Sequence, residues 1–449
     1  MKTSGQITFN RRAWLQAVSG MAVGATWMRT SRAGDLPDIT KPRATSGDSA
    51  IEPDWDERLT VTVGPDKADI TGQTGKVIQA AVDYAVRLGG GTVKILPGVY
   101  PLRNGIRLHA NVRICGSGCD TVLLKEPSVE TNLALDSDWF DQEITVADAA
   151  GFQIGDGVCI RATNPDTHGP VVIKRTLVAR SGNRFKLDRA LRENAWQLGK
   201  ASVATLFPIL TAEETSDLVI EDLCLDGNKD NNANLDGNYA GCIWLQDCSR
   251  VNIRNVTARN YNGDGISWQV CHDVLVENCH SHDHTGLGLH PGSGAQRTII
   301  RGNVLERNNI GIFFCWGVKY GLAEKNTIRD SRNCGISIGH RDDENVIRGN
   351  EIRNSGKTGV LFRPERGEGF TASGNRLEEN RIIDSGPEDG IAIDLQGVTR
   401  GNSIARNTLT ETRAPANRTG IRLGKDTRDN TLTDNTIEGF AVPVLYEKP

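Results

Sequence analysis

A short alternation of apolar and variable residues recurs through the second half of the chain. After each of eight glycines comes an apolar–variable–apolar triplet, as in Ile266-Ser267-Trp268, and this alternation predicts a short β-strand. Successive glycines are 23 to 31 residues apart, and a near-constant interval of this length is typical of a solenoid. The glycines are Gly241, Gly265, Gly288, Gly311, Gly335, Gly359, Gly390 and Gly420.

A second periodic position is occupied by asparagine, each time after a strand-like segment such as Val251–Asn255. Asparagine tolerates the left-handed backbone of a sharp turn, and stacked Asn amides can hydrogen-bond to one another. Coils of 23–24 residues with two or three short strands therefore predict a parallel β-solenoid, in which each coil covers the core of the next. The asparagines are Asn255, Asn278, Asn303, Asn326, Asn350, Asn380, Asn407 and Asn435.

The N-terminal part of this solenoid is predicted to begin with a covering helix. Val77, Ala81, Tyr84 and Leu88 form one apolar face of a helix over residues 76–88. A glycine-rich turn and a strand follow, so we expect the helix to shield the exposed first coil, as the terminal repeats of solenoids require.

The repeat is interrupted between about residues 128 and 210. Short apolar stretches separated by Asp/Gly turns predict antiparallel strands there, and we expect a β-rich insertion that reaches over the outer groove. The predicted organisation is a signal peptide over residues 1–33, a linker over 34–69 and a β-solenoid domain over 70–449 that contains this insertion.

The first residues predict export. Paired arginines, Arg11 and Arg12, precede a weakly apolar stretch and a small-residue site at Ser31-Arg32-Ala33, as in a twin-arginine signal. We therefore expect a periplasmic or extracellular protein. Without this basic segment the net charge falls from −4 to −9.

Composition excludes two classes of partner. Lys and Arg number 52 against 56 Asp and Glu, with no basic tract, which argues against a nucleic-acid binder. After the first thirty residues no apolar run is long enough to span a bilayer. The oligomeric state is left open.

No cofactor is predicted. The ten cysteines lack zinc-type spacing and are expected to be mostly core residues, with a disulfide framework as the alternative. The segment Asp226–Asn232 has the alternating oxygen ligands of a calcium loop but no closing glutamate, so calcium stays an alternative. His280, His282 and His284 could form a metal site, but the repeat predicts that His280 points inward.

Several motifs resemble a known family. Gln79–Asp83, Gly89–Val93 and Leu223–Asn232 resemble the catalytic modules of mannuronan C5-epimerases, which belong to the pectin-lyase-like proteins. The resemblance implies an all-β, right-handed parallel β-helix with an N-terminal helical cap, and a carbohydrate substrate. The family's catalytic tetrad is missing, because its Tyr-Gly-Phe-Asp-Pro-His pattern corresponds here to Asp264–Gln269, and its second Asp corresponds to Gly292.

The outward positions of the coils supply other candidate residues. Coils lie about 4.8 Å apart, so equal positions form columns. The bulky residues at the third position after each glycine are expected to point inward, and they are Trp244, Trp268, Phe314, Ile338 and Phe362. The outward positions and the turns that follow carry a polar, partly cationic strip on an acidic chain.

This strip matches the needs of chemistry on uronate sugars. Cations neutralise the sugar carboxylate and stabilise the charge that develops on proton removal, a role that we assign to Lys319 and Arg363. His290 and His340 are assigned to proton transfer, and Trp316 offers a flat face to a sugar ring. The remaining predicted substrate-binding residues are Gln269, Arg341, Asp342, Asp343, Glu365 and Asp394.

We therefore predict an exported enzyme that acts on an acidic polysaccharide by lyase or C5-epimerase chemistry. Two alternatives stay open. One is a glycoside hydrolase that uses two of the carboxylates of Asp342, Asp343, Glu365 and Asp394. The other is a non-catalytic glycan-binding solenoid.

Overall fold

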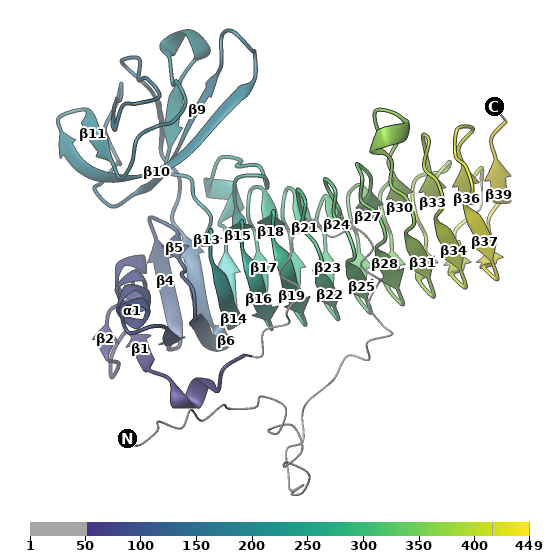
Figure 1. Ribbon diagram of the computed structural model, residues 1–449, viewed down its shortest axis with the longest axis horizontal. Coiled ribbons are helices and arrows are strands. Elements are labelled where there is room, and N and C mark those ends of the chain that lie inside the picture. Colours follow the sequence, from purple (N-terminus) through teal and green to yellow (C-terminus); the bar gives the residue numbers. More distant parts are fainter. Residues whose placement is uncertain (1–51, 415, 449) are drawn as a thin grey trace, which may run out of the picture. The chain divides into compact units, whose positions relative to one another are not determined.

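The computed structural model describes residues 52–414 and 416–448, and Figure 1 shows these as successive coils of short strands. The predicted signal peptide, residues 1–33, and the first part of the predicted linker lie outside the described residues. The strands form two parallel sheets along the solenoid, of 22 and 11 strands, and a separate six-stranded sheet.

The 22-strand sheet contains two strands from most coils. Its strands are β1 (Thr60–Gly64), β2 (Ile70–Thr71), β3 (Gly91–Ile95), β4 (Gly98–Leu102), β6 (Val112–Lys125), β14 (Ser216–Asp226), β16 (Ser249–Arg254), β17 (Thr257–Arg259), β19 (His272–Glu277), β20 (His280–His282), β22 (Ile299–Arg301), β23 (Val304–Glu306), β25 (Leu322–Glu324), β26 (Thr327–Arg329), β28 (Val346–Arg348), β29 (Glu351–Arg353), β31 (Arg376–Glu378), β32 (Arg381–Ile383), β34 (Ser403–Ala405), β35 (Thr408–Thr410), β37 (Thr431–Thr433) and β38 (Thr436–Glu438).

The 11-strand sheet takes one strand from each coil and carries the candidate site. Its strands are β5 (Ile106–Arg107), β13 (Leu210–Glu213), β15 (Gly241–Gln246), β18 (Asp264–Gln269), β21 (Leu287–Pro291), β24 (Ile310–Phe313), β27 (Cys334–Ile338), β30 (Thr358–Phe362), β33 (Ile391–Leu395), β36 (Thr419–Leu423) and β39 (Val442–Tyr446).

The core between the sheets is built from stacked apolar columns. Leu245, Trp268, Ile338 and Phe362 belong to one such column and are fully buried. Trp244 was predicted to share it, and that prediction is wrong. Gly241 pairs with Asp264 rather than with Gly265, so Trp244 falls in register with Ser267 on the outer face.

Asparagines form a hydrogen-bonded ladder through six coils, as predicted. In each step an Asn side-chain oxygen accepts from the backbone N–H and the side-chain amide of the Asn one coil before. Asn255 and Asn278 do not belong to it. They occupy the preceding position, where the backbone is left-handed with φ of 53° and 54°. The ladder consists of Asn303, Asn326, Asn350, Asn380, Asn407 and Asn435.

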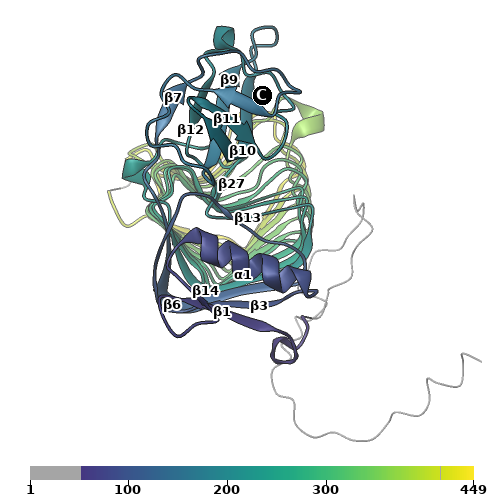
Figure 2. The ribbon, with the colours of Figure 1, turned by 90° about the vertical axis from the view of Figure 1, so that its left-hand side faces the viewer.

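The helix α1 (Gly75–Arg87) covers the first coil, as Figure 2 shows. Its buried residues are Ile78, Ala81, Val82 and Ala85. The buried face of the helix therefore differs from the predicted one, since Tyr84 and Leu88 are more than half exposed. The solenoid also starts earlier than expected, because β1 already pairs with β3.

The six-stranded sheet forms the predicted insertion and has its own hydrophobic core. Its strands are β7 (Glu130–Asn132), β8 (Glu143–Thr145), β9 (Gly157–Thr163), β10 (Pro170–Ser181), β11 (Arg184–Leu187) and β12 (Ser202–Ala204). The short 3₁₀ turns are η2 (Trp55–Glu57), η3 (Gln197–Gly199), η4 (Lys229–Asn231) and η5 (Glu368–Phe370). In the described residues, no helix has the length and apolarity needed to cross a bilayer.

Two sequence-based expectations about metal and sulfur chemistry can be compared with the fold. Eight of the ten cysteines are buried, and all ten are free thiols. His280 points outward and lies 3.0 Å from Glu306, whereas Ser281 takes the inward position beside Leu305. The predicted orientation of His280 is thus wrong by one residue. The described residues contain no group of three His, Cys, Asp or Glu placed to hold a metal ion.

Candidate functional site

One column of side chains on the outer face of the 11-strand sheet carries most of the candidate chemistry. We call it the outer column. Neighbouring members lie about 4.8 Å apart. From β13 to β36 it contains, in order, Thr211, Trp244, Ser267, His290, Phe313, Ser337, Leu361, Asp394 and Arg422.

His290 forms a buried pair with Asp264. The His290 Nδ1 lies 2.8 Å from the Asp264 Oδ2, and the other oxygen of Asp264 accepts a hydrogen bond from the backbone N–H of Leu287 at 2.9 Å. Both residues are only 3% exposed. Because the carboxylate favours the proton on Nδ1, Nε2 is left as the basic nitrogen. Among the described residues Nε2 has no hydrogen-bond partner.

Ser267 and Gln269 lie beside this pair and are fixed by hydrogen bonds. The Ser267 hydroxyl donates to the Gly237 carbonyl at 2.7 Å and accepts from the Gln269 side-chain amide at 2.9 Å. The Gln269 side-chain oxygen accepts from the backbone N–H of Ser293. Gln269, a predicted binding residue, therefore lies next to the pair, but its amide is already used within the protein.

The segment between β14 and β15, residues 227–240, lies over Asp264 and Ser267. We call it the covering segment. A Cβ built at Gly237 would lie 1.6 Å from the Asp264 Oδ2. Only glycine fits at this position, and the close approach shields Asp264 from water.

Arg363 lies further along the outer column, beyond Phe313. Its guanidinium lies 4.4 Å from the Phe313 ring centre, and the His290 ring contacts Phe313 edge-on, with 5.6 Å between the ring centres. Arg363 also donates to Ser337, Glu365 and the Phe314 carbonyl at 2.9–3.0 Å. The predicted cation is thus present, fixed by protein acceptors.

Asp342 lies behind this arginine and is fully buried. It accepts from the backbone N–H groups of Val318 and Gly339, and an Arg363 nitrogen lies 3.3 Å away. Burial raises the pKa of Asp342 to about 6, against the opposing effect of Arg363. Asp342 is therefore placed to organise the turn and the arginine and has no exposed oxygen for a ligand.

His340 is part of an aromatic stack. Its ring stacks on Trp316 at 4.5 Å and contacts Phe370 at 5.0 Å. Burial lowers the pKa of His340, with Glu365 opposing the shift. Trp316 is 44% exposed, so part of its ring surface is open to solvent.

Two further cations border this aromatic stack. Arg366 lies 5.0 Å from the Trp316 ring centre, and Arg341 lies 4.5 Å from that of Phe370. The predicted residues Trp316, His340 and Arg341 are therefore brought together, and Arg366 and Phe370 join them.

The other predicted residues lie apart from His290. Lys319 and Asp343 pair with each other at 2.6 Å on the turns that leave the 11-strand sheet. Asp394 belongs to the outer column but forms two hydrogen bonds with Arg422, at 2.6 and 2.8 Å. Each of the four predicted acidic residues thus has a cation partner within 4 Å.

The sequence reading missed Asp264. It was compared with the family's tyrosine position and was not considered as a partner for His290, which is 26 residues further along the chain. An acidic residue on one coil and a histidine on the same face of the next coil could have revealed the pair.

Comparison with known proteins agrees with this architecture. Residues 241–409 and 315–443 match the family model for a right handed beta helix region. The fold is a right-handed parallel β-helix. The predicted fold class is thereby confirmed.

Several solved structures share the β-helix. The A-module of the mannuronan C-5 epimerase AlgE4 from Azotobacter vinelandii is 17% identical, with 83% of this chain and 94% of that one covered and a TM-score of 0.48. PfbA, a surface adhesin of Streptococcus pneumoniae, is 13% identical, with 83% and 89% covered and a TM-score of 0.51. ORF18 of Geobacillus virus E2 is 12% identical, with 84% and 62% covered and a TM-score of 0.54. A search of curated proteins finds no match.

Proposed function

We propose that this β-helix is an exported enzyme that acts on an acidic, uronate-containing polysaccharide and removes the proton at C5 of a sugar unit. The observation that carries the proposal is the Asp264–His290 pair on the outer column, with the His290 Nε2 left without a partner. A histidine oriented by a carboxylate through one nitrogen and free at the other is the arrangement of a general base.

The first step would be the same for a lyase and for a C5-epimerase. His290 Nε2 accepts the C5 proton, and the Asp264 carboxylate stabilises the imidazolium that forms. Arg363 follows β30, three strands beyond the strand of His290, and its guanidinium reaches back to Ser337, about 10 Å along the column from His290, with Phe313 between them. A sugar ring lying over Phe313 would direct its carboxylate toward the arginine and its C5 toward the histidine.

The second step decides the reaction class. In a lyase the C4–O4 bond breaks, a C4=C5 double bond forms, and the leaving oxygen takes a proton. In an epimerase a proton returns to C5 from the opposite face. Trp316 and His340 would support neighbouring sugar rings along the same face in either case.

His290 is closed off from solvent, because its side chain is only 4% exposed, and a substrate reaches Nε2 only after the groups around it move. This closure favours the second candidate function, a non-catalytic glycan-binding solenoid in which the Asp264–His290 pair is structural. The carboxylate-based hydrolase has no such support, since all four of its candidate residues are engaged in ion pairs.

The test is proton NMR of the protein with a panel of acidic and neutral polysaccharides. The proposal predicts vinylic signals or altered sugar signals on an acidic polymer only. His290→Ala should lower kcat by about 10²–10⁴-fold, and Asp264→Asn should also lower it while its affinity for the polymer is kept. His168→Ala, an exposed histidine on the insertion, serves as the matched control. Turnover that survives His290→Ala would contradict the proposal, and binding without turnover on every polymer would favour the second candidate.

A further inference from the structure

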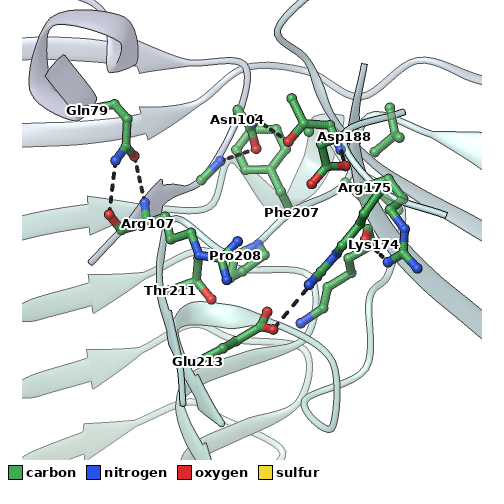
Figure 3. A pocket seen from close by; sticks show the side chains of 16 residues that line it. Gln79, Asn104, Arg107, Lys174, Arg175, Asp188, Phe207, Pro208, Thr211 and Glu213 are labelled. Atoms are coloured by element: carbon green, nitrogen blue, oxygen red, sulfur yellow. Dashed lines mark hydrogen bonds and ion pairs between the residues drawn. The ribbon is translucent and has the colours of Figure 1, made fainter. Parts of the chain in front are cut away.

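A cavity of about 220 Å³ lies between the insertion and the first coils of the β-helix. Figure 3 shows the residues that line it. Lys174 and Arg175 on β10 and Asp188 after β11 form one side. Thr211 and Glu213 on β13 belong to the opposite side. The volume is below the usual range for drug-sized ligands, so the cavity suits one small unit, such as a single sugar ring.

The lining is cationic on a chain that is acidic overall. Arg107, Lys174, Arg175 and Arg189 line it together with two acidic residues, Asp188 and Glu213. Arg175 is saturated by backbone carbonyls, including two hydrogen bonds of 2.5 Å to Ala190 and Leu191. Arg189 lies 3.8 Å from Glu213.

Two polar atoms of the lining lack hydrogen-bond partners among the described residues. The Lys174 ammonium and the Thr211 hydroxyl are both buried, and within the described part of the chain neither forms a hydrogen bond. A buried ammonium without an acceptor is costly. The Lys174 ammonium lies above the Trp244 ring, and burial lowers the pKa of Lys174 to about 7. An anion with a hydroxyl or ring oxygen beside it would satisfy both atoms.

The cavity is aligned with the candidate catalytic pair. Thr211 belongs to the outer column described above, and Trp244 and Ser267 separate it from His290. Three strand spacings place it about 14 Å from His290. A polymer that reaches both places would pass over the covering segment, whose Gly237 carbonyl accepts a hydrogen bond from Ser267 between them.

We propose that this cavity is a subsite for a carboxylate-bearing sugar unit, with Lys174 as the carboxylate ligand and Thr211 as a hydroxyl donor. The choice of ligand rests on the proposed function. The subsite would anchor a polymer at a distance from the reacting unit, so it would govern affinity and dependence on chain length rather than the chemical step.

Calorimetric titration of the full chain with hexuronate trisaccharides and neutral hexose trisaccharides tests the subsite. Lys174→Met keeps the stem above Trp244 and removes the charge, and it should weaken hexuronate binding by about 10- to 100-fold. Thr211→Val should weaken it by a smaller factor, and Lys174→Arg should retain most of it. Lys186→Met, an exposed lysine on the same insertion, should bind like the wild type.

Three results would overturn the subsite. These are unchanged hexuronate affinity in both Lys174→Met and Thr211→Val, equal affinity for neutral trisaccharides, and no binding by any trisaccharide. With a polymer that is turned over, Lys174→Met should raise KM and leave kcat unchanged. If His290→Ala loses turnover but Lys174→Met has the KM of the wild type, the subsite is refuted and the proposed function is not. If hexuronates bind in a way that depends on Lys174 but no polymer is turned over, the proposed enzyme is refuted and the subsite is supported.

Discussion

Replacing Asn350 by alanine should destabilise the β-helix strongly. Asn350 is 1% exposed and lies in the middle of the asparagine ladder. Its side-chain oxygen accepts from the backbone N–H and the amide of Asn326, and its own amide donates to the Ala323 carbonyl and to Asn380. Alanine would leave a backbone N–H and a carbonyl buried without their partners and an amide with one partner fewer.

Each buried group that loses its partner costs about 1–3 kcal/mol. Two such groups, with a smaller loss at the amide, predict a decrease of about 3–6 kcal/mol in the free energy of unfolding. Asn435 provides a matched control, because it ends the ladder and is partly open to water. Water can replace its hydrogen bonds, so Asn435→Ala should cost about 1 kcal/mol.

Urea unfolding followed by far-UV circular dichroism measures both variants, with refolding to check reversibility. If unfolding is irreversible, unfolding rates in a fixed urea concentration replace the equilibrium values. Equal costs for the two variants, or a cost below about 1.5 kcal/mol for Asn350→Ala, would refute the idea that the ladder stabilises the coils through buried hydrogen bonds.

Two further predictions concern pH and the covering segment. Burial lowers the pKa of His284 to about 3, below that of the unfolded chain, so this residue should reduce stability by up to about 1.4 kcal/mol per pH unit as pH falls from 6.5 toward 3. His284→Asn should lessen this fall in urea titrations at pH 7 and pH 5, and parallel losses in both proteins would contradict the assignment. Gly237→Ala places a methyl group against Asp264 and should lower kcat by disturbing the His290 pair, with a cost of about 1–3 kcal/mol in stability. Gly369→Ala is the control, because the added methyl group meets open space there. Wild-type activity in Gly237→Ala would argue against a catalytic role for Asp264.

The coil period, the asparagine ladder, the covering helix and the insertion could all be predicted from the sequence, because they follow from local patterns and their repetition. The direction in which a single side chain points, toward the core or toward solvent, was harder to predict from the sequence. Counting from glycine misplaced Trp244, since Gly241 is not equivalent to Gly265 in the sheet, and a one-residue shift reverses a side chain between core and surface.

The candidate site was predictable only in part. His290 and the Trp316–His340 contact follow from equal positions on neighbouring coils. The covering segment does not, because its contacts depend on how a long connection folds back over the sheet. Asp264 lies on the coil before His290 and was missed because the two residues were not compared. The ion pairs that engage the predicted carboxylates likewise depend on the exact register of side chains in adjacent coils.

The most direct measurement is proton NMR of a hexuronate polymer incubated with the protein in D₂O. Removal of the C5 proton predicts either loss of the H5 signal through exchange with deuterium or a new vinylic H4 signal, and both should vanish in His290→Ala. New reducing ends with an intact H5 signal would contradict the account and indicate a hydrolase. Binding of the polymer with no spectral change on any hexuronate would instead identify a glycan-binding β-helix.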